Sequence, residues 1–104
     1  MVKSKSFKIV WDRKALDELK EILDYLGEQN LQAAKAVKST LVERLEIIKT
    51  NPLICVTDDL KIPPDKNFRV FFIYSYRITY QIKKEFNQLR IIRIRHTSRE
   101  PLIH

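Results

Sequence analysis

The 104-residue sequence has one cysteine, Cys55, and one glycine, Gly27. A single cysteine cannot form an internal disulfide, a pattern typical of proteins that fold in a reducing compartment. No apolar run approaches the roughly 18 residues that a membrane-spanning helix needs. The N-terminus also lacks the apolar segment of a signal peptide. We therefore expect a cytoplasmic protein that has no membrane partner.

The length and composition are those of one domain covering residues 1–104. An apolar fraction of 44% argues against a disordered chain. A chain of this length buries roughly two thirds of its unfolded surface, so it can form a core without disulfides or metal ions. The sequence has no glycine-rich phosphate loop and no cluster of metal-ligating residues, and we expect no cofactor and no metal.

The net charge of +7 is distributed unevenly along the sequence. Residues 1–59 contain ten basic and ten acidic side chains, whereas residues 60–104 contain ten basic and three acidic ones. A one-sided positive field favours a polyanion or an acidic protein as partner. Charge that served only solubility would be expected to spread more evenly.

The first half of the sequence predicts a strand followed by two helices. Apolar residues alternate with others in residues 6–11, which indicates the strand. Asp12 is a plausible N-cap for a first helix, which Gly27 would end with a left-handed residue. After a link of three or four residues, Asn30 would cap a second helix of about 20 residues that ends before Pro52. Both helices carry an apolar stripe, so the resulting hairpin must pack on an apolar surface.

The second half predicts three consecutive strands, at residues 68–73, 76–84 and 89–95. The connector before them, residues 52–67, has no apolar period, and its prolines exclude a central strand. Neither residue of the link at 74–75 favours positive φ, so one longer bent strand is an alternative there. The order strand, helix, helix, strand, strand, strand predicts an α+β fold. We expect the helical hairpin on one face of a mostly antiparallel, four-stranded sheet.

The strand at residues 76–82, YRITYQI, defines the two faces of this sheet. Its tyrosines and isoleucines alternate with arginine, threonine and glutamine, which is the period of a half-buried strand. Further along, Ile92 and Ile94 alternate with two arginines in the same way. The arginines expected together on the open, polar face are Arg77, Arg93 and Arg95.

These features, in this order, resemble the RelE/ParE toxin family of bacterial type II toxin–antitoxin systems. The resemblance covers nearly the whole chain and rests on FKIVW near the start, the helical hairpin, YRITYQI and the closing IIRIRHTSREP. It implies a growth-arresting toxin of a plasmid-stabilisation module, neutralised by a cognate antitoxin protein. A homodimer and a heterotetramer with the antitoxin are both open as assemblies.

The resemblance also implies one of two targets. RelE-like members cleave mRNA in the ribosomal A site, and Arg77 matches the strand arginine that they use on the phosphate. Arg69 falls where those nucleases often have a further basic residue. No tyrosine follows Tyr80, however, and the ending around His96 and Arg99 looks more like that of ParE-like members, which poison DNA gyrase. This favours gyrase, with a ribosome-dependent, metal-free mRNA endonuclease as the alternative, or a component that retains antitoxin binding only.

The nuclease alternative would need groups that move a proton and stabilise a charged phosphorus. A placed acid or base contributes typically 10²- to 10⁴-fold, and arginine offers a planar fork for phosphate oxygens. The candidate catalytic residues are Arg77 and His96, since histidine titrates near neutrality. Alternatively, Arg77 is a solvated outer-face residue and His96 a strand-end residue bonded to backbone. The candidates for binding nucleic acid or a protein target are Arg69, Arg77, Arg93, Arg95 and Arg99.

Overall fold

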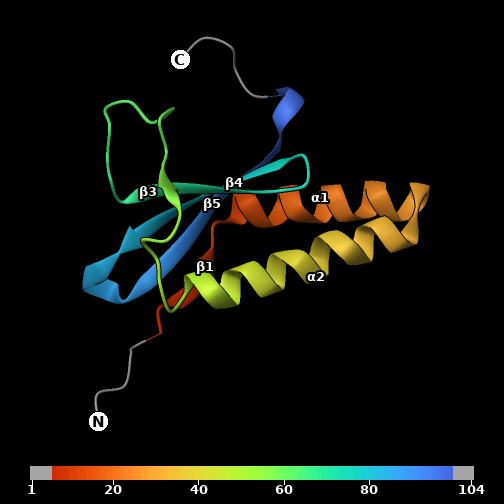
Figure 1. The fold of residues 1–104 in the computed structure, drawn as a ribbon. Helices are drawn as coiled ribbons and strands as arrows, with labels where there is room; N and C mark the ends of the chain where they lie inside the picture. The colour runs from red at the N-terminus through yellow and green to blue at the C-terminus, as the bar shows by residue number, and fades with distance from the viewer. Residues whose placement is uncertain (1–5, 100–104) are drawn as a thin grey trace.

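Two helices lie on one face of a five-stranded sheet in the computed structural model, which describes residues 6–99 (Figure 1). The strand order is β1-β5-β4-β3-β2, in which β1 is parallel to β5 and every other pair is antiparallel. The elements are β1 (Lys8–Trp11), α1 (Arg13–Gln29), α2 (Leu31–Ile48), β2 (Val56–Thr57), β3 (Phe68–Ile73), β4 (Tyr76–Lys83) and β5 (Gln88–His96), with 3₁₀ turns η1 (Lys84–Phe86) and η2 (Thr97–Arg99). The predicted α+β architecture is confirmed, with β2 added as a short fifth strand within the connector.

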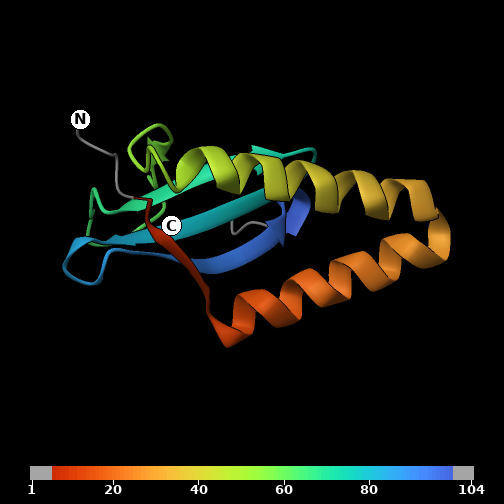
Figure 2. The same ribbon diagram turned by 90° about the horizontal axis from the view of Figure 1, so that it is seen from below.

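The two helices meet at one residue, Asn30, and diverge from that end (Figure 2). The Asn30 side chain accepts hydrogen bonds from the backbone N–H groups of Gln32 and Ala33, at 2.9 and 3.3 Å, so it caps α2 as predicted. The prediction that Gly27 ends α1 is wrong, since no glycine has positive φ and the helix continues to Gln29. The extended backbone of Asn30, with φ −163°, ends α1 instead.

The core lies between the helices and the face of the sheet that they cover. The alternation predicted for residues 76–82 is confirmed: Ile78, Tyr80 and Ile82 are at most 3% exposed, and Tyr76 packs against them. The helices contribute apolar residues at their predicted spacing. The fully buried side chains among these are Ala15 of α1 and Ile48 of α2.

A β-bulge in β5 changes the predicted alternation of that strand. The register shifts where Arg93 and Ile91 pair with successive residues of β4, so Ile92 has no partner there. The prediction that Ile92 and Ile94 share a face is therefore wrong. Ile91 and Ile94 are the core residues, 0% and 4% exposed, and Ile92 is half-buried. The extra residue of a bulge moves the side chains that precede it to the opposite face of the sheet from the one that strict alternation predicts.

Two non-glycine residues with positive φ close the hairpins. The link between β3 and β4 is a tight two-residue turn in which Tyr74 has φ 53°, so the alternative of one longer bent strand is wrong. Asn87, with φ 54°, follows η1 and leads into β5. Asparagine tolerates this region better than most residues, whereas tyrosine gives no such signal in the sequence.

The connector covers part of the sheet face that lies away from the helices. Val70 alternates with the core residue Phe71 and so points to that face, yet it is only 3% exposed. In Figure 1 the connector rises on the side of the sheet opposite the helices. The prediction of an open face is thus correct only in part. We refer to residues 58–67 of the connector as the strap.

The buried hydroxyl of Tyr80 makes stability sensitive to alkaline pH. It donates a 2.6 Å hydrogen bond to the carbonyl of Pro52, and burial is the main cause that raises the pKa of Tyr80. A raised folded-state pKa gives stability that is fully present below the unfolded value of about 10 and is lost as the pH rises beyond it. We expect Tyr80→Phe to lose about 1 kcal/mol at neutral pH through the missing hydrogen bond.

Tyr80→Phe should also reduce the loss of folding stability that occurs as the pH rises above about 10. Urea unfolding of both proteins at about pH 7 and about pH 11 checks this expectation. If the two proteins lose the same stability between these pH values, the buried hydroxyl of Tyr80 is not the group responsible.

Candidate nucleic-acid or target-binding site

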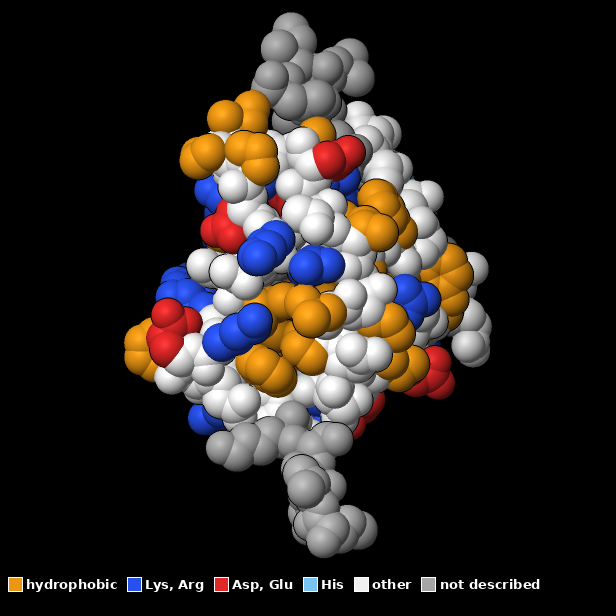
Figure 3. Space-filling view, turned by 60° about the vertical axis from the view of Figure 1, so that its left-hand side comes forward, with side chains coloured by type: hydrophobic (Ala, Val, Ile, Leu, Met, Phe, Trp, Pro, Cys, Tyr) orange, Lys and Arg blue, Asp and Glu red, His pale blue; other side chains and the backbone are white. Residues whose placement is uncertain are grey.

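Basic side chains of the second half pair with carboxylates of the first half. These pairs are Arg77 with Asp58, Arg90 with Asp12, and Arg93 with Glu18. Asp12 precedes α1, but its side chain makes no capping bond. On the face shown in Figure 3, lysine and arginine side chains lie among apolar and acidic ones. The charge separation along the sequence is therefore reduced in space.

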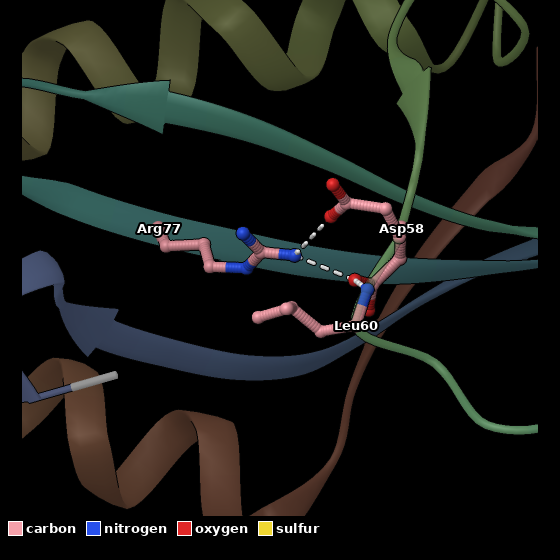
Figure 4. A network of polar contacts seen from close by, with 4 residues as sticks. Asp58, Leu60 and Arg77 are labelled. Atoms are coloured by element: carbon pink, nitrogen blue, oxygen red, sulfur yellow. Dashed lines mark hydrogen bonds and ion pairs between the residues drawn. The ribbon is translucent and has the colours of Figure 1, made fainter. Parts of the chain in front are cut away.

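Arg77 points away from the helices, as predicted, but the strap covers it. The residue is 9% exposed, and its Nη2 lies 2.5 Å from Asp58 Oδ1 and 3.8 Å from Asp59 Oδ1 (Figure 4). Its guanidinium carbon is 5.8 Å from the centre of the Phe72 ring. Arg77 is thus neither a solvated outer-face residue nor a group that a ligand reaches directly.

His96 ends β5 with its ring held by two neighbours. The Tyr76 ring meets it edge-on, with centroids 5.4 Å apart. His96 Nδ1 lies 2.7 Å from Ser98 Oγ and accepts the backbone N–H of Ser98 at 3.1 Å. A backbone N–H only donates, so Nδ1 carries no proton in this arrangement and a neutral ring has its proton on Nε2. His96 then presents a hydrogen-bond donor at Nε2 rather than a base.

Arg69 lies on the opposite face of the sheet from Arg77. It pairs with the core residue Tyr80 in the register of β3 and β4. Its Nε donates to the carbonyl of Lys66 at 2.8 Å and its Nη1 to the carbonyl of Cys55 at 2.9 Å. Arg69 therefore ties together the two ends of the connector.

The two candidate catalytic residues also point to different faces. In the register of β4 and β5, Arg77 pairs with Arg95 and Tyr76 pairs with His96. Successive side chains of a strand alternate between faces, so Arg77 and His96 have the sheet between them. The structure does not bring them together around one phosphate.

A hollow of about 560 Å³ between α1 and the end of β5 instead brings together three of the predicted residues, Arg93, Arg95 and His96. We call it the α1–β5 hollow. Apolar, aromatic and charged side chains line it together. Those that bear on its chemistry are Glu21, Tyr25, Tyr76, Arg93, Arg95 and His96. The side chain of Arg99, and all of Glu100 and His104, lie outside the described residues.

The hollow exists because β1 covers only the first part of β5. The pairing of β1 ends at Trp11 with Ile91, and α1 lies beside the rest of the strand. There Glu18 of α1 takes the place of a strand: its Oε1 accepts the backbone N–H of Ile94 at 2.9 Å and its Oε2 accepts Nε of Arg93 at 3.0 Å. Nothing in the sequence distinguishes Glu18 from the other acidic residues of the helix, since acidic residues on the polar face of a helix are common.

Removing the Glu18 carboxylate should loosen this end of the sheet. Glu18→Ala would leave the backbone N–H of Ile94 without its acceptor, and we expect a loss of about 1–3 kcal/mol. Glu18→Gln keeps an amide oxygen for that N–H and should lose less than half as much. Urea unfolding measures both variants. Equal losses would mean that the charge pairing with Arg93, and not the bond to Ile94, carries the effect.

Among residues 6–99, no group of three or more His, Cys, Asp or Glu side chains could hold a metal ion. No helix within this part of the chain is long and apolar enough to cross a membrane.

Solved structures of toxins share this fold. The chromosomal ParDE system of P. aeruginosa matches with a TM-score of 0.63 and 18% identity, over 88% of this chain and 96% of that one. A mutant of the E. coli toxin RelE in its free state matches with a TM-score of 0.61 and 21% identity, over 86% of this chain and 82% of that one. The toxin–antitoxin complex RelBE2 of Mycobacterium tuberculosis matches with a TM-score of 0.57 and 18% identity, over 90% of this chain and 94% of that one. Identities this low show a shared fold.

The family follows from the sequence. The family model described as the ParE toxin of the type II toxin–antitoxin system, parDE, matches residues 9–101. Because the match spans most of the chain, the protein belongs to this family and is a toxin of a type II toxin–antitoxin module. The resemblance predicted from YRITYQI and the closing strand is confirmed. Comparison with curated proteins yields no significant match.

Proposed function

We propose that this toxin arrests growth by acting on DNA gyrase, in the manner that the resemblance implies for ParE-like members. The observation that supports this most is the separation of Arg77 from His96 by the sheet, with Arg77 covered by the strap. A nuclease that used both groups on one phosphate would need them on one surface. A toxin that acts by binding a protein target needs only an accessible and specific surface.

We propose the α1–β5 hollow as that surface. It is a concave surface whose lining combines apolar, aromatic and charged side chains. Here Tyr25 and Tyr76 supply aromatic contact area, and Arg93 and Arg95 supply planar cationic groups. Aromatic and arginine side chains are the types that most often dominate binding energy at protein interfaces. Arg99 follows Ser98, a lining residue of the hollow, directly in the chain and stays a predicted binding residue.

Two assays on the purified wild-type toxin test the target. We expect inhibition of supercoiling by DNA gyrase, and intact mRNA in a primer-extension assay on translating ribosomes. Cleavage at A-site codons without gyrase inhibition would establish the nuclease instead. Growth arrest in cells with neither effect would reject both mechanisms.

The nuclease alternative, a ribosome-dependent and metal-free mRNA endonuclease, keeps one observation in its favour. Arg77 and Arg95 are direct partners across β4 and β5, on the face away from the helices. Two arginines side by side could hold a phosphate group between them. On this alternative, Asp58 would have to leave Arg77 before the substrate binds.

The partner that neutralises the toxin is proposed to be a cognate antitoxin, with both proteins in the cytoplasm. Support comes from the similar structures, of which one is the ParDE system and another the RelBE2 toxin–antitoxin complex. We propose a module of the plasmid-stabilisation type, in which the toxin forms a homodimer or a heterotetramer with the antitoxin. Light scattering of the toxin alone and with its antitoxin distinguishes these assemblies.

A further inference from the structure

The α1–β5 hollow borders a stretch of sheet edge that no described strand covers. β4 pairs with β5 from Gln88 to His96, whereas β1 pairs with the other side of β5 only as far as Ile91. Beyond Ile91, the backbone N–H of Ile94 points to this uncovered side, where it donates to Glu18 Oε1 at 2.9 Å. Glu18 thus occupies one hydrogen-bonding position of the edge and leaves the next ones open.

Two backbone groups beside Glu18 have no partner in the described part of the chain. In an antiparallel pair, successive residues direct their N–H and C=O groups alternately toward and away from the neighbouring strand. Since Ile94 points away from β4, the carbonyl of Ile94 and the N–H of His96 both lie on the uncovered edge. The N–H of Thr97 then points back toward β4 and donates to the carbonyl of Ser75 at 2.8 Å, as this alternation requires.

The two groups are placed to bond to one residue of a parallel strand. Such a residue, opposite Arg95, donates its N–H to the carbonyl that precedes Arg95 and accepts the N–H that follows it. β1 uses the same slanted pattern earlier on this edge, where the N–H of Asp12 donates to the carbonyl of Ile91 at 2.9 Å. An antiparallel residue opposite Ile94 would instead need the N–H that Glu18 holds. A parallel segment would continue the line of β1.

The lining of the hollow indicates which side chains such a segment carries. Paired residues of parallel strands point to the same face, so the residue opposite Arg95 lies on the face of Arg93 and Arg95. An acidic side chain fits there, because opposite charges on neighbouring strands attract. Its two neighbours in the segment point to the other face, where Ile22, Tyr25 and Tyr76 line the hollow. Apolar side chains fit these positions.

The space is sufficient for a short peptide. The hollow of about 560 Å³ lies within the range of roughly 300–1,000 Å³ that is usual for ligand pockets. Addition of a strand to a sheet edge gains affinity from main-chain hydrogen bonds and specificity from alternate side chains.

We propose that the target adds a short extended segment to the uncovered edge of β5, parallel to that strand and with the side-chain pattern apolar, acidic, apolar. The central residue of the segment donates its N–H to the carbonyl of Ile94 and accepts the N–H of His96. This inference rests on the proposed function, in which the α1–β5 hollow binds DNA gyrase, and it adds the form of the gyrase segment that binds.

Hydrogen exchange of the wild-type toxin, followed by mass spectrometry at single-residue resolution, tests the bond to His96. The N–H of His96 has no acceptor in the free toxin and should exchange rapidly. We expect saturating DNA gyrase to slow this exchange about 100-fold, because a bonded amide exchanges only when its bond opens. Thr57 is the control: the N–H of Asp58 donates to Phe68 of β3, so that of Thr57 points to the free edge across the sheet. Its exchange should not change.

A backbone ester separates this hydrogen bond from simple coverage of the edge. Replacing the N–H of His96 with an ester oxygen removes the donor and keeps every side chain. About tenfold more of this protein should be needed to inhibit gyrase supercoiling by half. The same ester at Thr57 removes an N–H at the opposite edge and should leave inhibition unchanged. Circular dichroism checks that both proteins fold, and should either fail, the exchange experiment decides alone.

Two results would overturn strand addition while leaving gyrase as the target. One is gyrase inhibition by the wild-type toxin with unchanged exchange at His96, and the other is equal inhibition by the two esters. If the wild-type toxin does not inhibit gyrase, the proposed function fails and strand addition fails with it.

Discussion

Replacing Arg77 with alanine is expected to destabilise the protein by about 3–5 kcal/mol, because it leaves the buried carboxylate of Asp58 without its counter-ion. The Asp58 side chain is 11% exposed, so water compensates for little of the lost pairing. Small domains are stable by only about 5–15 kcal/mol, so this one change could unfold a large fraction of the molecules. Urea unfolding followed by circular dichroism measures the loss.

Two control variants separate the buried charge from the lost side chain. Asp59→Ala should change stability little, because Asp59 is 87% exposed. The double variant Asp58→Leu with Arg77→Met replaces the pair by apolar side chains and should recover most of the loss. An Arg77→Ala protein within about 1 kcal/mol of the wild type would mean that the strap does not bury this pair in solution.

This expectation changes how toxicity data are to be interpreted. A nuclease would lose activity on Arg77→Ala because a phosphate contact is missing, whereas a gyrase-directed toxin would lose it because the fold fails. Loss of toxicity in that variant therefore identifies neither mechanism until stability is known.

Ile91→Ala is expected to destabilise the protein by about 2–5 kcal/mol, while Ile92→Ala should lose about 1 kcal/mol or less. The bulge turns Ile91 into the core with 0% exposure and leaves Ile92 half-buried and without a partner in β4. The two changes remove the same atoms from adjacent residues, so each serves as the control for the other. Urea unfolding of both variants gives the comparison.

A reversed order would contradict the bulge. With unbroken alternation back from Ile94, Ile92 would face the core and Ile91 would face the strap side. Ile92→Ala would then be the more damaging change, and Arg90 and Arg93 would no longer share a face.

Local patterns in the sequence predicted most of the fold. The alternation in YRITYQI identifies the core face of β4, because successive side chains of a strand point to opposite faces and no bulge interrupts this strand. Asn30 was recognised as a cap because its side chain bonds to N–H groups two and three residues away. In both cases the information needed for the prediction lies within a few consecutive residues of the sequence.

The misjudged features depend on contacts between distant parts of the chain. The pair of Arg77 and Asp58 joins residues 19 positions apart, and that of Arg93 and Glu18 joins residues 75 apart. No local pattern indicates that a connector will cross the sheet and bury Arg77, or that α1 will supply a carboxylate to the edge of β5. The sequence therefore predicts Arg93, Arg95 and His96 as candidate site residues, but neither the α1–β5 hollow that they line nor the residues that α1 contributes to it.

The most direct test of this account is inhibition of gyrase supercoiling by three purified proteins: the wild type, Arg95→Glu and Lys84→Glu. Both variants reverse one positive charge, but Arg95 lines the α1–β5 hollow, whereas Lys84 is exposed in η1 at the opposite end of β4. We predict that the wild type and Lys84→Glu inhibit gyrase equally and that Arg95→Glu, while still folded, does not. Equal inhibition by all three proteins, or none by the wild type, would contradict the account.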